Sequence, residues 1–217
     1  MVRVNFVASL DGAITVGGRS AGLGSPADKR IFDLLRALAD VVLVGHGTAS
    51  AEGYGPITAG SRIGRLRESL GRPATAPIAV VSRRASLDPG GRLASGGGSP
   101  TILVTCEAAD AGLRRRAGEV ADVVVAGTDA VDPGAAMAAL GERVHRLALC
   151  EGGPTLLAQL AATGNLDELC LTVAPLLAGG HGPRVLTGSA LPAPAVLRIA
   201  SLLEDDGFLL LRYLVER

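Results

Sequence analysis

The sequence lacks an excess of charge of either sign. Its 217 residues carry 21 basic and 21 acidic side chains, and no run of like charge is longer than Arg114-Arg115-Arg116. Nucleic acids and anionic membranes are bound by strong fields of one sign, which this balance does not provide. We therefore expect neither a nucleic-acid nor a membrane partner.

Long apolar runs and paired cysteines are missing as well. No segment of about 18 residues is uninterruptedly apolar, and the chain opens directly on a strand pattern, so no transmembrane helix is predicted. The cysteines Cys106, Cys150 and Cys170 are an odd number without metal-ligand spacing, which is typical of buried thiols in a reducing compartment. We expect a soluble, cytoplasmic protein without a metal site.

Common nucleotide-binding and catalytic motifs are also absent. No G-x-G-x-x-G follows Val44, and no Walker pattern occurs anywhere in the chain. The histidines His46, His145 and His181 are scattered, and none belongs to a recognisable Ser-His-Asp or Cys-His arrangement. Neither standard nucleotide fingerprint is therefore present, and triad chemistry is not expected.

What is present is an alternation of short apolar strands with helices. Strands typical of a sheet covered on both faces are expected at 2–8, 40–45, 78–82, 101–105 and 122–126. Helices are expected at 26–39, 108–117, 133–143 and 154–162, the first with Ser25 as its N-cap and Pro26 at its first position. This order predicts mostly parallel strands.

The end of the chain departs from this alternation. Segments 197–203 and 208–215 flank Glu204-Asp205-Asp206-Gly207, where Asp-Asp-Gly is a hairpin signal. We therefore predict one α/β domain over residues 1–217, with a mostly parallel mixed sheet, helices on both faces and a C-terminal antiparallel hairpin.

Three turns that follow buried strands are suited to anions. They are Gly45-His46-Gly47-Thr48, Ser82-Arg83-Arg84 and Glu151-Gly152-Gly153-Pro154-Thr155. Glycine lets a phosphate approach the backbone, and a helix start adds N–H donors with partial positive charge. Because ligands of open α/β sheets bind at the carboxyl ends of the strands, three such turns along one edge suit a dinucleotide.

Three carboxylates stand out near the predicted strand ends, namely Asp11, Glu52 and Glu151. Acids around one pocket accept hydrogen bonds from an amino-rich heterocycle or assist proton transfer, so these three are candidate catalytic residues. Glu151 also has a structural alternative, in which it caps the helix that starts at Pro154.

The order and spacing of several motifs resemble a known family over nearly the whole chain. These motifs are Ser9-Leu10-Asp11-Gly12, Leu35-Arg36-Ala37, the stretch from Asp40 to Thr48, Glu151-Gly152-Gly153-Pro154-Thr155-Leu156, and Pro175 with Gly179-Gly180. Together they resemble the reductase domain of the riboflavin-biosynthesis deaminase/reductase, which is the RibD C-terminal domain family. That family has a three-layer dihydrofolate-reductase-like fold.

The resemblance implies an NADPH-dependent oxidoreductase that reduces the ribosyl chain of a 5-amino-6-ribosylamino-pyrimidine 5′-phosphate to a ribityl chain, and it implies a homodimer. Asp11 and Glu52 are candidates for polarising the reacting carbon, a role that ordered water or the substrate phosphate could also fill. Substrate contacts would come from Ser20, Arg36 and Glu151. The implied NADPH contacts are Gly45, Gly47, Thr48, Ser82, Arg83, Gly152, Gly153, Pro154, Thr155 and Leu156.

The chain departs from the family pattern on the substrate side. Gly22 stands where family members usually carry an aromatic residue. An acid pair followed by proline is replaced by Glu52-Gly53-Tyr54-Gly55-Pro56, and Arg62 is the nearest arginine beyond it. The zinc pattern of the deaminase half is absent, so we expect another chain to perform deamination. Two alternatives stay open: a reductase of dihydrofolate or another pterin, and a catalytically silent NADP-binding homologue.

Overall fold

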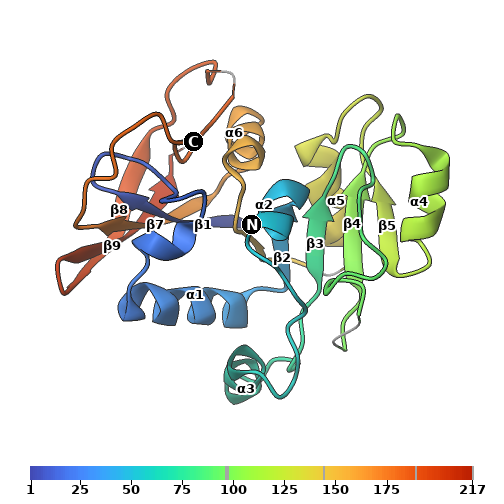
Figure 1. Cartoon of the computed structure of the whole chain (residues 1–217), viewed down its shortest axis with the longest axis horizontal. Coiled ribbons are helices and arrows are strands. Elements are labelled where there is room, and N and C mark those ends of the chain that lie inside the picture. Colours follow the sequence, from blue (N-terminus) through green and yellow to red (C-terminus); the bar gives the residue numbers. More distant parts are fainter. Residues whose placement is uncertain (96–97, 144, 189, 217) are drawn as a thin grey trace. The chain divides into compact units, whose positions relative to one another are not determined.

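The computed structural model describes residues 1–95, 98–143, 145–188 and 190–216. Contacts divide the chain into two compact units. Unit 1 comprises Met1–Phe32 and Cys150–Arg217, and unit 2 comprises Asp33–Leu149. In Figure 1, unit 1 has the blue and the orange-to-red elements, and unit 2 the elements from light blue to yellow.

Unit 2 is built on parallel strands that pair in the order β5-β4-β3-β2. The strands are β2 (Val41–Gly45), β3 (Ile78–Val81), β4 (Thr101–Thr105) and β5 (Ala121–Val125), and β6 (Ala148–Cys150) ends where unit 1 resumes. The helices are α2 (His46–Ala51), α3 (Arg62–Ser69), α4 (Ala111–Ala117) and α5 (Pro133–Glu142). The predicted parallel strands are therefore confirmed.

Buried apolar residues explain why these strands form. Val42, Val44 and Val80 are fully buried, and Ile78 is nearly so. They belong to a hydrophobic cluster that also includes Ala49 of α2. Burial of β-branched side chains along whole strands is what the uninterrupted apolar runs indicated.

The helices of unit 2 differ in part from the prediction. Helix α4 begins at Ala111 rather than at 108, because the carboxylate of Asp110 caps it by accepting from the N–H of Leu113 at 2.8 Å. Helix α3 was not predicted because its sequence, RIGRLRES, has few apolar positions. The hydroxyl of Ser61 caps α3, accepting from the N–H of Gly64 at 3.0 Å.

Unit 1 contains the mixed part of the sheet, with strand order β1-β7-β9-β8. Strands β1 (Val2–Ser9) and β7 (Glu168–Ala174) are parallel, while β9 (Phe208–Val215) is antiparallel to both β7 and β8 (Leu197–Asp205). Helices α1 (Pro26–Leu38), which continues into unit 2, and α6 (Pro154–Ala162) lie on opposite sides of β1 and β7 (Figure 1). The predicted cap of α1 is confirmed, because Ser25 Oγ accepts from the N–H of Asp28 at 3.1 Å.

The C-terminal hairpin forms where Asp-Asp-Gly predicted it. Asp206 and Gly207 have positive φ values of 52° and 79°, which suit a tight hairpin turn. Strand β8 is largely exposed, and Ile199, Leu202 and Leu203 are each at least half exposed. The homodimer stays a prediction.

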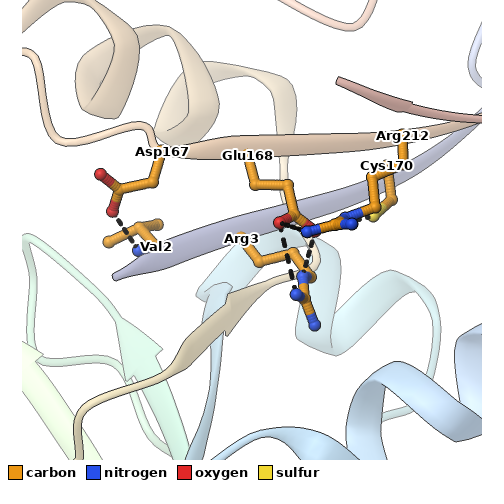
Figure 2. Close-up of polar contacts among 6 residues, drawn as sticks. All are labelled: Val2, Arg3, Asp167, Glu168, Cys170 and Arg212. Atoms are coloured by element: carbon orange, nitrogen blue, oxygen red, sulfur yellow. Dashed lines mark hydrogen bonds and ion pairs between the residues drawn. The ribbon is translucent and has the colours of Figure 1, made fainter. Parts of the chain in front are cut away.

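A buried carboxylate links three strands of unit 1 (Figure 2). Glu168 on β7 is 1% exposed and lies between Arg3 of β1 and Arg212 of β9. Arg212 Nη2 is 2.8 Å from Glu168 Oε2, and Arg3 donates to both carboxylate oxygens. Burial opposes ionisation of Glu168, but the hydrogen bonds from Arg212 and Arg3 outweigh it and lower the pKa of this carboxyl.

The cysteines are buried and unpaired, as predicted. Burial raises the pKa of the Cys150 and Cys170 thiols to about 12, so neither is a thiolate near neutral pH. None of the helices in the described ranges is long and apolar enough to cross a lipid bilayer.

We expect Glu168→Gln to lower the free energy of unfolding by roughly 3 kcal/mol at pH 7, since it leaves two arginines without their shared anion. Because the pKa of Glu168 is lowered in the folded protein, its contribution to the free energy of unfolding is fully present above pH 4.5, the ordinary pKa of a glutamate. The contribution is lost as the pH falls through the lowered pKa of the folded state. Urea unfolding at several pH values measures it.

The exposed pair Arg30–Asp205 provides the control, because its side chains are 59% and 52% exposed. Asp205→Asn should change the free energy of unfolding by no more than about 0.5 kcal/mol. If both variants lost the same stability, Glu168 would not have the role described.

Candidate functional site

The first predicted cofactor turn joins β2 to α2 in unit 2. Gly45 ends the strand, and α2 begins at His46, so the expected turn is the start of a short helix. Gly47 is exposed, and a Cβ built there would meet nothing within 4 Å. Its backbone therefore has open space beside it, and Thr48 follows on the same helical turn.

The second predicted cofactor turn follows β3, and its two residues differ in access. Ser82 is 6% exposed, and its Oγ accepts from the N–H of Ser86 at 2.9 Å. Arg83 is exposed, and its Nε donates to the carbonyl of Asp129 at 2.9 Å. Arg83 is therefore the better placed of the two to meet a phosphate from solvent.

The third turn, in unit 1, leads from β6 into α6. Glu151 is buried at 8% exposure, and the peptide bond between Gly152 and Gly153 is cis. Gly152 has φ of +103°, and a Cβ there would lie 3.1 Å from the ring of Phe6, so no larger residue fits. Close packing of the backbone against β1 explains this glycine.

The start of α6 fits an anionic group. Its N-cap residue is Gly153, and no side chain caps the helix from that position. The first N–H groups of a helix have no partner within the helix and carry partial positive charge, and here they include those of Thr155 and Leu156. A dinucleotide pyrophosphate is chemically suited to this end of the helix.

Asp11 is a structural acceptor in unit 1. Its carboxylate accepts from the N–H groups of Ala178 at 3.0 Å and Gly179 at 2.7 Å, and from the hydroxyl of Ser9. The hydrogen bonds from Ser9, Ala178 and Gly179 lower the pKa of this exposed carboxyl from 3.8 to about 2. Asp11 is therefore an anion at neutral pH and holds no proton to donate, while it joins the loops that follow β1 and β7.

The structure points to one acid that the sequence analysis did not consider. Asp28 lies in the first turn of α1, and burial raises its pKa despite a hydrogen bond with Thr172 of β7 and the nearby charge of Lys29. Its pKa is raised, whereas those of Asp11 and Glu168 are lowered. Catalytic acids typically have raised pKa values.

The loop after β1 contains a predicted substrate residue and a departure from the family pattern. Ser20 begins a 3-10 helix, η1 (Ser20–Leu23), that lies against β1. A Cβ at Gly22 would lie 3.2 Å from the Cβ of Val16. Val16 therefore occupies the space beside position 22, and a bulky residue there would require this loop to shift.

Arg36 and Glu52 lie in unit 2. The guanidinium carbon of Arg36 is 5.0 Å from the centroid of the Tyr54 ring, so the two side chains form a cation–π contact. Glu52 caps the C-terminus of α2, with its N–H donating to the carbonyl of Thr48 at 3.0 Å.

The predicted residues thus fall into two groups. Unit 2 carries Arg36, Gly45, Gly47, Thr48, Glu52, Ser82 and Arg83, and unit 1 carries Asp11, Ser20 and residues 151–156. Within the part of the chain that the structure describes, no three His, Cys, Asp or Glu side chains gather into a metal-binding group.

Comparison with known proteins gives consistent matches. The model of the RibD C-terminal domain family matches residues 1–209. An Archaeoglobus fulgidus protein is 29% identical over 191 residues, covering 87% of each chain, and a Methanothermobacter thermautotrophicus protein is 31% identical over 193 residues, covering 85% of this chain and 82% of its own. Both are named 2,5-diamino-6-ribosylamino-4(3H)-pyrimidinone 5′-phosphate reductase.

Solved structures confirm the predicted fold. A pyrimidine reductase-like protein from Corynebacterium diphtheriae superposes with a TM-score of 0.84 at 25% identity, covering 100% of this chain and 92% of its own. Dihydrofolate reductase from Enterococcus faecalis superposes with a TM-score of 0.51 at 12% identity, covering 100% and 97%, which shows likeness of fold alone.

We expect Asp11→Asn to release the loop that follows β7. An amide replaces the anion, so the N–H groups of Ala178 and Gly179 lose a charged acceptor, and their hydrogen exchange should quicken by about tenfold. Hydrogen exchange measured residue by residue from pH 5 to 8 tests this. Because the pKa of Asp11 is about 2, its carboxyl stays ionised over that range, and the ratio of the exchange rates in the variant and the wild type should stay constant. Ser9→Ala, which keeps both backbone bonds, should change exchange less, and equal effects of the two variants would count against the assignment.

Proposed function

Because the chain belongs to the RibD C-terminal domain family, we propose that it reduces the ribosyl chain of a 5-amino-6-ribosylamino-pyrimidine 5′-phosphate to the ribityl form. The observation that carries the proposal is the family match over residues 1–209. The relatives from Archaeoglobus fulgidus and Methanothermobacter thermautotrophicus are named reductases of the 2,5-diamino-6-ribosylamino-pyrimidinone 5′-phosphate. Their names favour that compound as the substrate. The reaction adds a hydride to C1′ of the opened ribose and a proton to the attached oxygen or nitrogen.

The family and the fold indicate a nicotinamide cofactor, and we propose NADPH. When bound, the reduced nicotinamide supplies the hydride. The start of α6, whose N-cap residue is a glycine, and the open backbone at Gly47 suit the phosphates of such a cofactor. The exposed guanidinium of Arg83 suits the additional 2′-phosphate that distinguishes NADPH from NADH.

Asp28 is the proposed source of the proton. Hydride addition leaves charge on an oxygen or nitrogen, and the acid that neutralises it should have a raised pKa, so that it keeps its proton to a higher pH than an ordinary aspartate does. The raised pKa of Asp28 meets this requirement, whereas the pKa of Asp11, about 2, does not. Glu151, buried at 8% exposure beside the third turn, keeps its proposed role as an acceptor for the pyrimidine.

A second candidate function is the reduction of a pterin on the same fold. Asp28 is the observation that favours it, because a pterin pocket is expected to present an acid to the ring. The two candidates differ in one simple respect: the first requires recognition of a substrate phosphate, for which Arg36 is the proposed ligand, and the second does not.

We expect the protein to oxidise NADPH, and NADH far less well, when it is given the ribosylamino-pyrimidine 5′-phosphate. Loss of absorbance at the reduced nicotinamide band measures this, with dihydrofolate as the competing substrate. Arg36→Ala should raise KM for the phosphorylated substrate by about tenfold or more and leave KM for NADPH nearly unchanged.

Three results would argue against this assignment. Turnover of dihydrofolate alone would establish the second candidate. Binding of NADPH without turnover of either compound would identify a silent homologue. Equal losses for substrate and cofactor in Arg36→Ala would remove the phosphate role from that residue.

Asp28→Asn should lower kcat by about a hundredfold or more, the usual effect of removing a general acid, because an amide of the same shape has no proton to donate. In the wild type, kcat should fall as the pH rises through the raised pKa of Asp28, since the acid must be protonated to act. The variant should lack that dependence. Exposed Asp205 gives the matched control, and Asp205→Asn should leave kcat unchanged.

A further inference from the structure

Tyr54 is held rigidly in the loop that follows α2. Its ring packs, half-buried, against the hydrophobic cluster that contains Val44, Ala49 and Ile57. Its N–H donates to the carbonyl of Ala49 at 2.9 Å, which fixes the backbone. A tyrosine anchored in this way has few alternative positions for its ring.

Arg92 lies beside the two glycines that flank Tyr54. Arg92 Nη1 donates to the carbonyl of Gly53 at 2.9 Å, and a Cβ at Gly55 would lie 3.0 Å from Arg92 Nη2. Gly53 also has φ of +66°, a conformation that other residues rarely adopt. The backbone of the segment 53–55 is thus contacted by Arg92 through one hydrogen bond, and Gly53 has a conformation that favours glycine.

Arg36 meets the ring of Tyr54 at the last turn of α1. Its guanidinium carbon lies 5.0 Å from the ring centroid. Its main-chain carbonyl accepts from Nη1 of the buried Arg67 at 3.2 Å, so the helix end that carries it is fixed as well. A long arginine side chain otherwise samples many rotamers and loses that freedom when it binds a ligand.

We propose that Tyr54 is a positioning residue that holds the Arg36 guanidinium ready for the phosphate of the substrate. The N–H donors of a guanidinium lie in its plane, so an aromatic ring against its face does not block them. Two of these donors can then bind a phosphate together. The proposal rests on the function proposed above and adds specificity to it. It also gives a role to Tyr54, which stands within the segment that departs from the family pattern.

Three variants test the role of the ring. Tyr54→Phe keeps the aromatic face, whereas Tyr54→Leu and Tyr54→Met keep an apolar side chain for the cluster and remove that face. Both aliphatic variants should raise KM for the 5′-phosphorylated substrate about three- to tenfold with kcat within twofold, and Tyr54→Phe should restore the wild-type KM.

Two comparisons separate positioning from a general structural role. KM for the dephosphorylated substrate should not change in the aliphatic variants, because that compound has nothing for Arg36 to bind. Adding Tyr54→Leu to Arg36→Ala should raise KM no further, since the ring acts through the arginine. A full additional loss in the double variant, or an equal loss with the dephosphorylated compound, would overturn the proposal.

A spectroscopic measurement separates failure of this inference from failure of the proposed function. The ring current of Tyr54 should shift the Nε–H resonance of Arg36 in wild type and Tyr54→Phe, and that shift should disappear in Tyr54→Leu. Ribose 5-phosphate should move this resonance at lower concentration in the wild type than in Tyr54→Leu. Equal responses would refute the inference even if the substrate is turned over, whereas different responses without turnover would refute only the function.

Discussion

The buried carboxylate of Glu168 is the interaction on which unit 1 depends. A charge at 1% exposure is tolerable only when it is paired, and its partners come from the strands on either side of β7. Slipping β1 or β9 by one residue would turn Arg3 or Arg212 to the other face and leave the carboxylate alone. The strand register that Glu168 selects also sets where β1 and β7 end. The loops that follow these two strands are joined by the hydrogen bonds of Asp11.

A second buried charged side chain, that of Arg67, holds segments of unit 2 together. Arg67, at 2% exposure, donates from Nη1 to the carbonyls of Arg36, Ala37 and Ala39, and from Nε to that of Pro73. The first three carbonyls lie at the C-terminus of α1, where a helix leaves its carbonyls unpaired, so one guanidinium both caps α1 and connects α3 to it. The position of Arg36 over Tyr54 is a consequence of where the helix stops.

Local patterns were enough to predict most of the fold. The apolar strands, the cap at Ser25 and the Asp-Asp-Gly turn each depend on neighbouring residues, and each was predicted from the sequence. Helix α3 was missed because its position depends on tertiary contacts of Arg67 rather than on an apolar stripe. The raised pKa of Asp28 was missed for a related reason, since it depends on burial in the folded chain, which outweighs the opposing hydrogen bond with Thr172, a residue far along the sequence. The family resemblance indicated which turns to examine, but it could not tell the buried hydroxyl of Ser82 from the exposed guanidinium of Arg83.

The residues that depart from the family pattern, at position 22 and in segment 53–55, contact other side chains of the chain. These contacts bear on whether the protein has lost catalytic activity. At position 22 the missing aromatic side chain is matched by Val16, whose Cβ lies 3.2 Å from where a Cβ would be. In the segment 53–55, Arg92 donates to the carbonyl of Gly53 and lies beside Gly55, and Tyr54 between them contacts the guanidinium of Arg36. Drift after loss of function removes contacts without replacing them, whereas here each change is accommodated by another side chain. The pattern therefore favours changed substrate recognition over loss of catalysis.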